Sequence, residues 1–136
     1  MNILLIGNDP SSFATLANRL GQEDDVTLVY ADSEAAGLER VRARGDNAVD
    51  LVIVGGPLTD MDKIRFVRQL VQINPLVNTV VIGSLPDEAF HEATEGLGVL
   101  LQLSPQPGED DAENLLALLR KITVLMQPES TGAGSK

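Results

Sequence analysis

Small and polar residues stand directly after four apolar segments of this chain, where buried strands would end. They are Gly7, Asn8 and Asp9, then Gly55, then Gly83 and Ser84, and finally Ser104 and Pro105. In an open parallel sheet, sites are built where the carboxyl ends of the strands meet. The pattern therefore predicts one pocket between these loops, with Gly55, a residue that has no side chain, at the end of a central strand.

The glycines and the serine in these loops have two interpretations. Gly55 and Gly56 would let a phosphate or a nucleotide approach the backbone, but the stretch matches neither a dinucleotide-binding fingerprint nor a P-loop, so a turn is favoured. The hydroxyl of Ser84 could bind an anion, although a serine in a loop is ordinary. A small-ligand site of nucleotide or flavin type at this edge is kept as an alternative function.

The rest of the chain offers little catalytic chemistry. It has no cysteine, which excludes disulfides, thiolate metal sites and a cysteine nucleophile. Its one histidine, His91, lies in a short polar segment and is predicted to be a surface residue. No Ser-His-Asp arrangement, HExxH motif or catalytic carboxylate pair can be assembled from the other residues. We therefore predict that the protein is not an enzyme.

Composition and charge narrow the function classes. The 136 residues predict one domain, and 43% hydrophobic with 22% charged residues is typical of a soluble globular protein. The net charge of −10 argues against binding to nucleic acid, which needs clustered Lys and Arg. No apolar run approaches the roughly 18 residues of a membrane span, and the first residues lack the pattern of a signal peptide. The expected location is the cytoplasm.

Five short aliphatic segments alternate with five amphipathic ones. The predicted strands cover residues 3–6, 26–31, 51–54, 79–82 and 98–103, and the predicted helices begin near residues 10, 34, 60, 87 and 109. Alternation of this kind indicates a parallel sheet with helices on both faces. Strands one, three and four are the most uniformly apolar, so they should be central. This predicts an α/β fold, a flavodoxin-like (βα)5 doubly wound sheet with strand order 2-1-3-4-5.

Residues that favour helix starts stand before or inside the predicted helices. Asp9 suits an N-cap before Pro10, and Ser33 suits the N-cap of a helix over 34–44. Asp60 and Asp62 are predicted to cap the third helix and charge its first turn. The fourth helix should cover 87–95. The last helix should reach residue 126, and residues 127–136, rich in Ser, Gly and Thr, are predicted to be a disordered tail.

Four stretches of the chain together resemble the receiver domain of two-component response regulators. Residues 3–10 (ILLIGNDP) are similar to the first strand and acidic turn of that family, and residues 50–54 (DLVIV) to its third strand. Residues 58–62 (LTDMD) resemble the loop that commonly reads Leu-Pro-Gly-Met-Asp, and Ser104-Pro105 resembles the Lys-Pro step after strand five. The resemblance covers residues 1–126 as one receiver-like domain and implies a CheY-like three-layer sandwich with a role in two-component signal transduction.

The resemblance also implies a chemical site that this chain lacks. In the family, an Asp after strand three accepts a phosphoryl group, two acidic residues after strand one hold Mg²⁺, and a Thr or Ser and a Lys hold the phosphoryl oxygens. In this sequence the acceptor position corresponds to Gly55, and the acidic pair corresponds to Gly7 and Asn8. The Thr or Ser corresponds to Gly83, with Ser84 one step later, and the Lys corresponds to Ser104. The aromatic switch of strand five falls within one residue of Leu101. Pro105 alone matches, and with it we expect a cis peptide bond. The chain is therefore predicted to be a pseudo-receiver without a phosphoacceptor and without a magnesium site.

The favoured hypothesis is a stand-alone receiver-like module that acts by phosphorylation-independent protein–protein interaction. In the family, the face made by helix four, strand five and helix five is used for homodimers and outputs, and Leu97, Leu100 and Leu103 lie near it here. The expected partners are proteins of a signalling pathway, or a second copy of the chain. A further alternative keeps the protein in a phosphorelay through a displaced acceptor such as Asp9 or Asp60.

Overall fold

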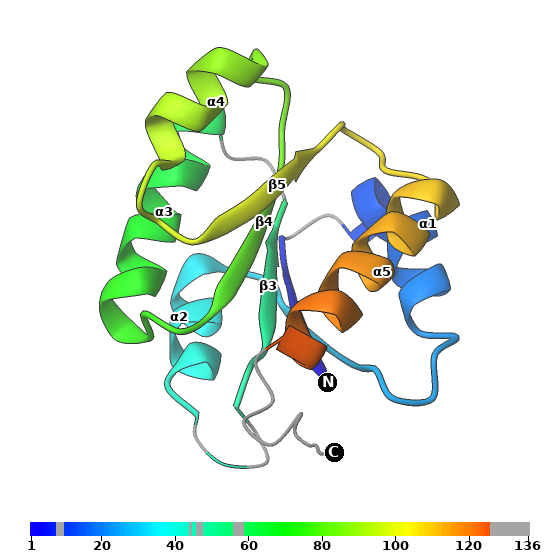
Figure 1. Ribbon diagram of the computed structural model, residues 1–136. Helices are drawn as coiled ribbons and strands as arrows, with labels where there is room; N and C mark the ends of the chain where they lie inside the picture. Colours follow the sequence, from blue (N-terminus) through cyan, green and yellow to red (C-terminus); the bar gives the residue numbers. More distant parts are fainter. Residues whose placement is uncertain (8–9, 44, 46–47, 56–58, 126–136) are drawn as a thin grey trace.

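Figure 1 shows the computed structural model of the protein, in which helices cover both faces of a five-stranded sheet. The structure describes residues 1–7, 10–43, 45, 48–55 and 59–125. The strands are β1 (Asn2–Ile6), β2 (Thr27–Ala31), β3 (Leu51–Val54), β4 (Asn78–Ile82) and β5 (Val99–Leu103). The helices are the 3-10 helix η1 (Pro10–Phe13), α1 (Ala14–Leu20), α2 (Glu34–Val41), α3 (Asp60–Ile73), α4 (Asp87–Thr94) and α5 (Glu109–Leu125).

Aliphatic residues without polar alternation form the three central strands. β1, β3 and β4 each contain four consecutive buried residues, a pattern typical of parallel strands that are covered on both faces. The strand order is β2-β1-β3-β4-β5, and all neighbours are parallel. The predicted flavodoxin-like order is therefore confirmed, with the second and fifth strands at the edges.

The edge strand β5 joins β4 with one irregularity. Thr79 pairs with Val99 and Val80 pairs with Leu101, so Leu100 is an extra residue between two rungs of the ladder. A bulge of this kind bends an edge strand and discourages pairing with another sheet. Contacts at this edge should therefore be made through side chains rather than through a regular backbone ladder.

Each face of the sheet has its own hydrophobic cluster. On one face α1 and α5 lie side by side, and Phe13, Leu16 and Leu115 are buried between them and the sheet (Figure 1). On the other face α2, α3 and α4 pack over the sheet, with Phe66 and Phe90 buried. Burial of one such side chain stabilises the fold by roughly 1.5–3 kcal/mol. The two clusters together hold the strand ends in fixed positions.

Two helices begin at side-chain caps. The Ser33 hydroxyl accepts a hydrogen bond from the Ala36 N–H (3.1 Å), as the sequence predicts. At α3 the cap is Thr59, whose hydroxyl accepts from the Asp62 N–H (3.1 Å). The prediction that Asp60 caps α3 is wrong, because Asp60 is already the first helical residue and an N-cap lies one position outside the helix. This leaves the Asp60 carboxylate available for another contact.

Other predicted boundaries differ in detail. α2 ends at Val41 rather than at residue 44, and the first helical segment begins as the 3-10 helix η1 before α1. The predicted cap Asp9 and the predicted tail 127–136 lie outside the described residues. The expectation of a cis peptide bond before Pro105 is wrong, since none of the described peptide bonds is cis. The loop turns instead at Gln106, which has a φ of +57°.

Candidate functional site

The loops that the sequence assigns to one pocket do follow neighbouring strands, and three glycines stand at the strand ends. Each glycine continues the sheet by one hydrogen bond from its N–H. The bonds run from Gly7 to the Ala31 oxygen (3.0 Å), from Gly55 to the Ile6 oxygen (2.9 Å) and from Gly83 to the Leu103 oxygen (2.9 Å). Binding of a phosphate by backbone amides requires N–H groups that point free of the protein. These three N–H groups are already engaged within the sheet.

Gly55, at the predicted acceptor position, is buried beside an aromatic ring. A Cβ atom on Gly55 would lie 3.1 Å from Cδ2 and 3.3 Å from Cε2 of Phe13, and 3.4 Å from Cδ1 of Ile82. Phe13 stands at the end of η1 and is 1% exposed. The ring of Phe13 therefore takes the space that a side chain at position 55 would need.

Gly83 is enclosed by polar groups instead. A Cβ atom there would lie 2.7 Å from Oδ1 of Asp60 and 2.9 Å from Oε1 of Gln102. Both distances are shorter than real Cβ contacts. The missing side chain at position 83 thus makes room for a carboxylate from α3 and an amide from β5.

Lys63 is buried at the same edge of the sheet. Lys63 is 6% exposed, and its ammonium donates a hydrogen bond to the carbonyl oxygen of Ile82, the last residue of β4. Burial lowers the pKa of the Lys63 ammonium below its ordinary value, and the charge of the nearby Asp60 acts in the opposite direction with a smaller effect. A cation thus stands at the end of β4, and it comes from α3.

Asp60 and Gln102 bind the loop between β4 and α4. Oδ2 of Asp60 accepts hydrogen bonds from both the N–H and the hydroxyl of Ser84, each at 3.3 Å. The side-chain amide of Gln102 accepts from the Leu85 N–H (3.0 Å) and donates to the Leu85 carbonyl (2.9 Å). We call Asp60, Lys63, Ser84 and Gln102 the polar cluster. It joins α3, the β4–α4 loop and β5.

Sequence reasoning missed two members of the polar cluster. Lys63 was not singled out, although it lies four positions before Val67 and seven before Leu70, on the buried stripe of α3. That spacing was the available signal. The strand-five switch position was placed within one residue of Leu101, and the residue that contacts the β4–α4 loop is Gln102.

The remaining predicted site residues do not join the cluster. Ser104 and Pro105 are exposed, and Asn8 and Asp9 lie outside the described residues. Asp62 pairs with Arg65 (3.0 Å). In the described part of the chain, no group of three or more His, Asp or Glu residues could hold a metal ion.

The predicted interaction face is only partly open. Leu97 and Leu100 are half-buried, so each presents some apolar surface. Leu103 was expected on the same face but is 6% exposed, because it packs into the cluster under α1 and α5. His91 on α4 is exposed, as predicted, with its ring 6.0 Å from that of Phe90.

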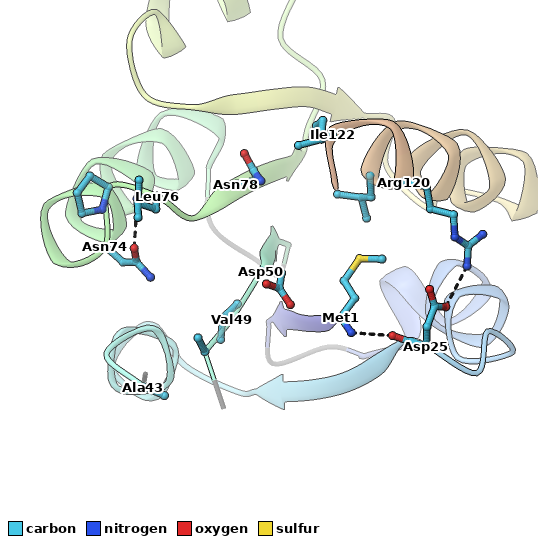
Figure 2. A pocket seen from close by; sticks show the side chains of 13 residues that line it. Met1, Asp25, Ala43, Val49, Asp50, Asn74, Leu76, Asn78, Arg120 and Ile122 are labelled. Carbon is cyan, nitrogen blue, oxygen red and sulfur yellow. Dashed lines mark hydrogen bonds and ion pairs between the residues drawn. The ribbon is translucent and has the colours of Figure 1, made fainter. Parts of the chain in front are cut away.

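The opposite edge of the sheet carries a hollow that the sequence did not indicate. It has a volume of about 1000 Å³ and is lined by the chain start, the entrance to β3, the turn before β4 and the later part of α5 (Figure 2). At one side Arg120 bonds Asp25 (3.0 Å), and the terminal ammonium of Met1 donates to the Asp25 carbonyl (2.7 Å). Leu76, which is 85% exposed, stands on the other side. The pocket predicted from the sequence belongs to the other edge, where the strands end.

Comparison with known proteins finds chains of similar structure and low sequence identity. No protein-family model matches the chain, and no curated protein matches it. A CheY-like response regulator receiver domain from Methanospirillum hungatei is 13% identical, with a TM-score of 0.69 over 88% of this chain and 94% of that chain. The receiver domain of an HD domain-containing protein from Pseudomonas fluorescens is 24% identical, with a TM-score of 0.68 over 90% and 94%.

These matches decide the architecture. The fold is the CheY-like flavodoxin fold. A pilus assembly-related protein from Burkholderia pseudomallei has the same fold, with 18% identity and a TM-score of 0.69 over 89% of this chain and 90% of that chain. Across the described residues, no helix has the length and apolar character needed to cross a membrane.

Proposed function

We propose that this protein is a receiver-like signal-transduction module that acts by binding another protein, without phosphorylation. The observation that carries the proposal is the contact of Phe13 with Gly55. In this fold the position after β3 is where a phosphoacceptor would stand, and here it has no carboxylate and is covered by a buried ring. A phosphoryl group would have neither an acceptor nor space at this position.

Incubation of the full chain with acetyl phosphate and Mg²⁺ tests this proposal. Intact mass spectrometry is expected to find no phosphorylated species. The Gly55→Asp variant is also expected to stay unmodified, since restoring the carboxylate restores neither the space nor a metal site. A stoichiometric gain of one phosphoryl group by the natural chain would overturn the proposal and favour the alternative of a displaced acceptor.

The displaced-acceptor alternative is less well supported for Asp60. Its Oδ2 already accepts two hydrogen bonds from Ser84, and the described residues contain no group of three or more His, Asp or Glu residues that could hold a metal ion. The small-ligand alternative is weakened by the engaged glycine N–H groups and by the groups that fill the space at Gly55 and Gly83. A bound nucleotide or flavin would be detected by the absorbance spectrum of the purified protein or by a thermal shift on addition of the ligand.

The charge of α4, β5 and the first half of α5 indicates what kind of partner fits. Residues 69–119 contain no Lys or Arg. The same segment carries the carboxylates of Asp87, Glu88, Glu92, Glu95, Glu109, Asp110, Asp111 and Glu113. Two copies meeting through this face would bring like charges together, which is unfavourable. A partner with a basic surface is therefore proposed in preference to a homodimer, with Leu97 and Leu100 as apolar contacts.

Charge reversal tests this binding face. The double variant Glu92→Lys and Glu95→Lys should lose partners that are captured and crosslinked by the natural protein. A matched variant with the same change of net charge, Glu34→Lys and Glu39→Lys on the exposed side of α2, should keep them. Equal loss in both variants would indicate a general charge effect and reject this face. Since one neighbour is a pilus assembly-related protein, proteins of pilus assembly are a reasonable first class to screen.

A further inference from the structure

We propose that the polar cluster is a built-in clamp that holds the β4–α4 loop in one arrangement without a phosphoryl group. Asp60, Lys63 and Gln102 are then positioning residues of the binding face, because they set where α4 begins relative to β5. This inference rests on the proposed function, in which the face formed by α4, β5 and α5 meets the partner.

Gln102 connects the loop to the edge strand. Its side chain takes up both backbone hydrogen-bonding groups of Leu85, at 3.0 and 2.9 Å. Two bonds from one planar amide fix the orientation of the Leu85 peptide groups as well as their distance. α4 begins two residues later, at Asp87. The start of α4 is therefore tied to β5 by a side chain that belongs to the binding face.

Asp60 connects the same loop to α3. It accepts from the N–H and hydroxyl of Ser84, the residue next to Leu85. Both bonds are long, at 3.3 Å, so the individual contribution of each is modest. Consecutive residues of the loop are thus held from two different elements, α3 and β5.

Lys63 places a buried ammonium at the end of β4, near Asp60. It lies one helical turn after Asp60 and bonds the Ile82 carbonyl, just before Gly83. Asp60 is only partly buried, and its charge favours the ammonium form of the buried Lys63, although burial has the larger effect on the pKa of that ammonium. Gly83 suits this arrangement, since a Cβ there would displace the ends of the Asp60 and Gln102 side chains.

Amide hydrogen exchange of the full chain, followed residue by residue by NMR, tests the clamp. The Gln102→Leu variant removes both bonds to Leu85. The Gln102→Glu variant keeps an acceptor for the Leu85 N–H and serves as the conservative control. The N–H of Gly7, which bonds the Ala31 oxygen at the far side of the same edge, reports on the rest of the sheet.

Exchange of the Leu85 N–H is expected to become about tenfold faster in Gln102→Leu, the size expected for loss of one hydrogen bond. In Gln102→Glu the exchange rate of the Leu85 N–H should change less than about threefold. The exchange rate of the Gly7 N–H should be the same in both variants as in the natural chain. Backbone resonances of residues 87–94 should shift in Gln102→Leu. Lys63→Met should speed exchange of the Ser84 N–H in the same way.

Unchanged Leu85 exchange in Gln102→Leu, or an equal acceleration at Leu85 and Gly7, would overturn the clamp. These measurements need no partner, so they are independent of the proposed function. If the loop is loosened but partner capture equals that of the natural chain, the positioning role is rejected and the proposed function stands. If the clamp behaves as expected and charge reversal on α4 has no effect on capture, the proposed binding face is rejected.

Discussion

The two edges of the sheet differ in how completely side chains fill them. At the carboxyl edge three glycines end the strands, yet the Phe13 ring lies against Gly55, and Asp60 and Gln102 close in on Gly83. At the amino edge the sequence predicts no pocket, yet a hollow of about 1000 Å³ lies between the turn before β4 and α5 (Figure 2). An absent side chain is therefore a poor indicator of an open pocket, because neighbouring groups move into the space.

The difference also concerns charge. At the carboxyl edge the ammonium of Lys63 is buried and bonds the Ile82 carbonyl, and the partly buried carboxylate of Asp60 accepts from the Ser84 N–H. At the amino edge Arg120 bonds Glu23 (2.8 Å) and Asp25 (3.0 Å) among exposed side chains. Exposed ion pairs contribute little to stability, whereas buried polar groups are sensitive to the loss of any one partner. Perturbation of the two edges should accordingly have very different consequences.

The largest effect is expected at the carboxyl edge from Gly55→Asp. The new side chain would press on the Phe13 ring and bury a carboxylate, so we expect a loss of about 3 kcal/mol in the free energy of unfolding. Urea denaturation measures it. Gly108→Asp is the matched control, since a Cβ there meets no atom within 4 Å and the residue directly precedes α5. Similar stability of the two variants would show that Phe13 is not fixed over Gly55.

A pH effect is expected from Lys63. Because burial lowers its pKa in the folded protein, the unfolded chain binds more protons between the folded value and the ordinary value of 10.5. The free energy of unfolding of the natural chain should therefore rise, relative to Lys63→Met, as the pH is raised through this window. Below the folded pKa the difference between the two proteins should stay constant. Urea denaturation midpoints of both proteins, measured from neutral pH upward, give this difference in stability. A difference that falls as the pH rises would show that the charge of Asp60 affects the pKa of Lys63 more than burial does.

A smaller effect is expected at the amino edge from Arg120→Gln. Loss of its bonds to Glu23 and Asp25 should lower the melting temperature slightly at low salt. At about 1 M salt, where exposed charges are screened, the difference from the natural chain should disappear. Arg68→Gln, at an exposed position of α3, controls for the change in net charge. A loss that persists in salt would indicate that the Arg120 stem packs in the hollow.

The smallest effect is expected from Leu76→Ser on the rim of the hollow. With 85% of the residue exposed, the free energy of unfolding should change by less than about 0.5 kcal/mol. Leu70→Ser, at a fully buried position of α3, should in contrast cost several times more. A loss above about 1 kcal/mol at Leu76 would mean that another part of the protein, or a second copy, covers the hollow. Dilution of the sample would distinguish these two cases, since only cover by a second copy depends on protein concentration.

The sequence by itself determined the scaffold. Continuous aliphatic runs such as Leu51–Val54 can only be satisfied by strands buried on both faces, and their alternation with amphipathic segments requires a parallel, doubly wound sheet. The small residues that follow the strands, Gly55 among them, are equally local facts. They needed no knowledge of what lies across the fold.

Only the tertiary structure decided what stands in place of the missing groups. Phe13 is distant from Gly55 in the chain, and Gln102 is distant from Leu85, so no local periodicity relates them. Lys63 could be assigned to the inside of α3 only by its spacing from Val67, and its partner, the Ile82 carbonyl, belongs to another element. Local patterns specify which residues face inward, whereas long-range packing specifies which of them meet. At the carboxyl edge the sequence alone therefore predicts a pocket, whereas in the folded protein Phe13, Asp60 and Gln102 occupy the space beside Gly55 and Gly83.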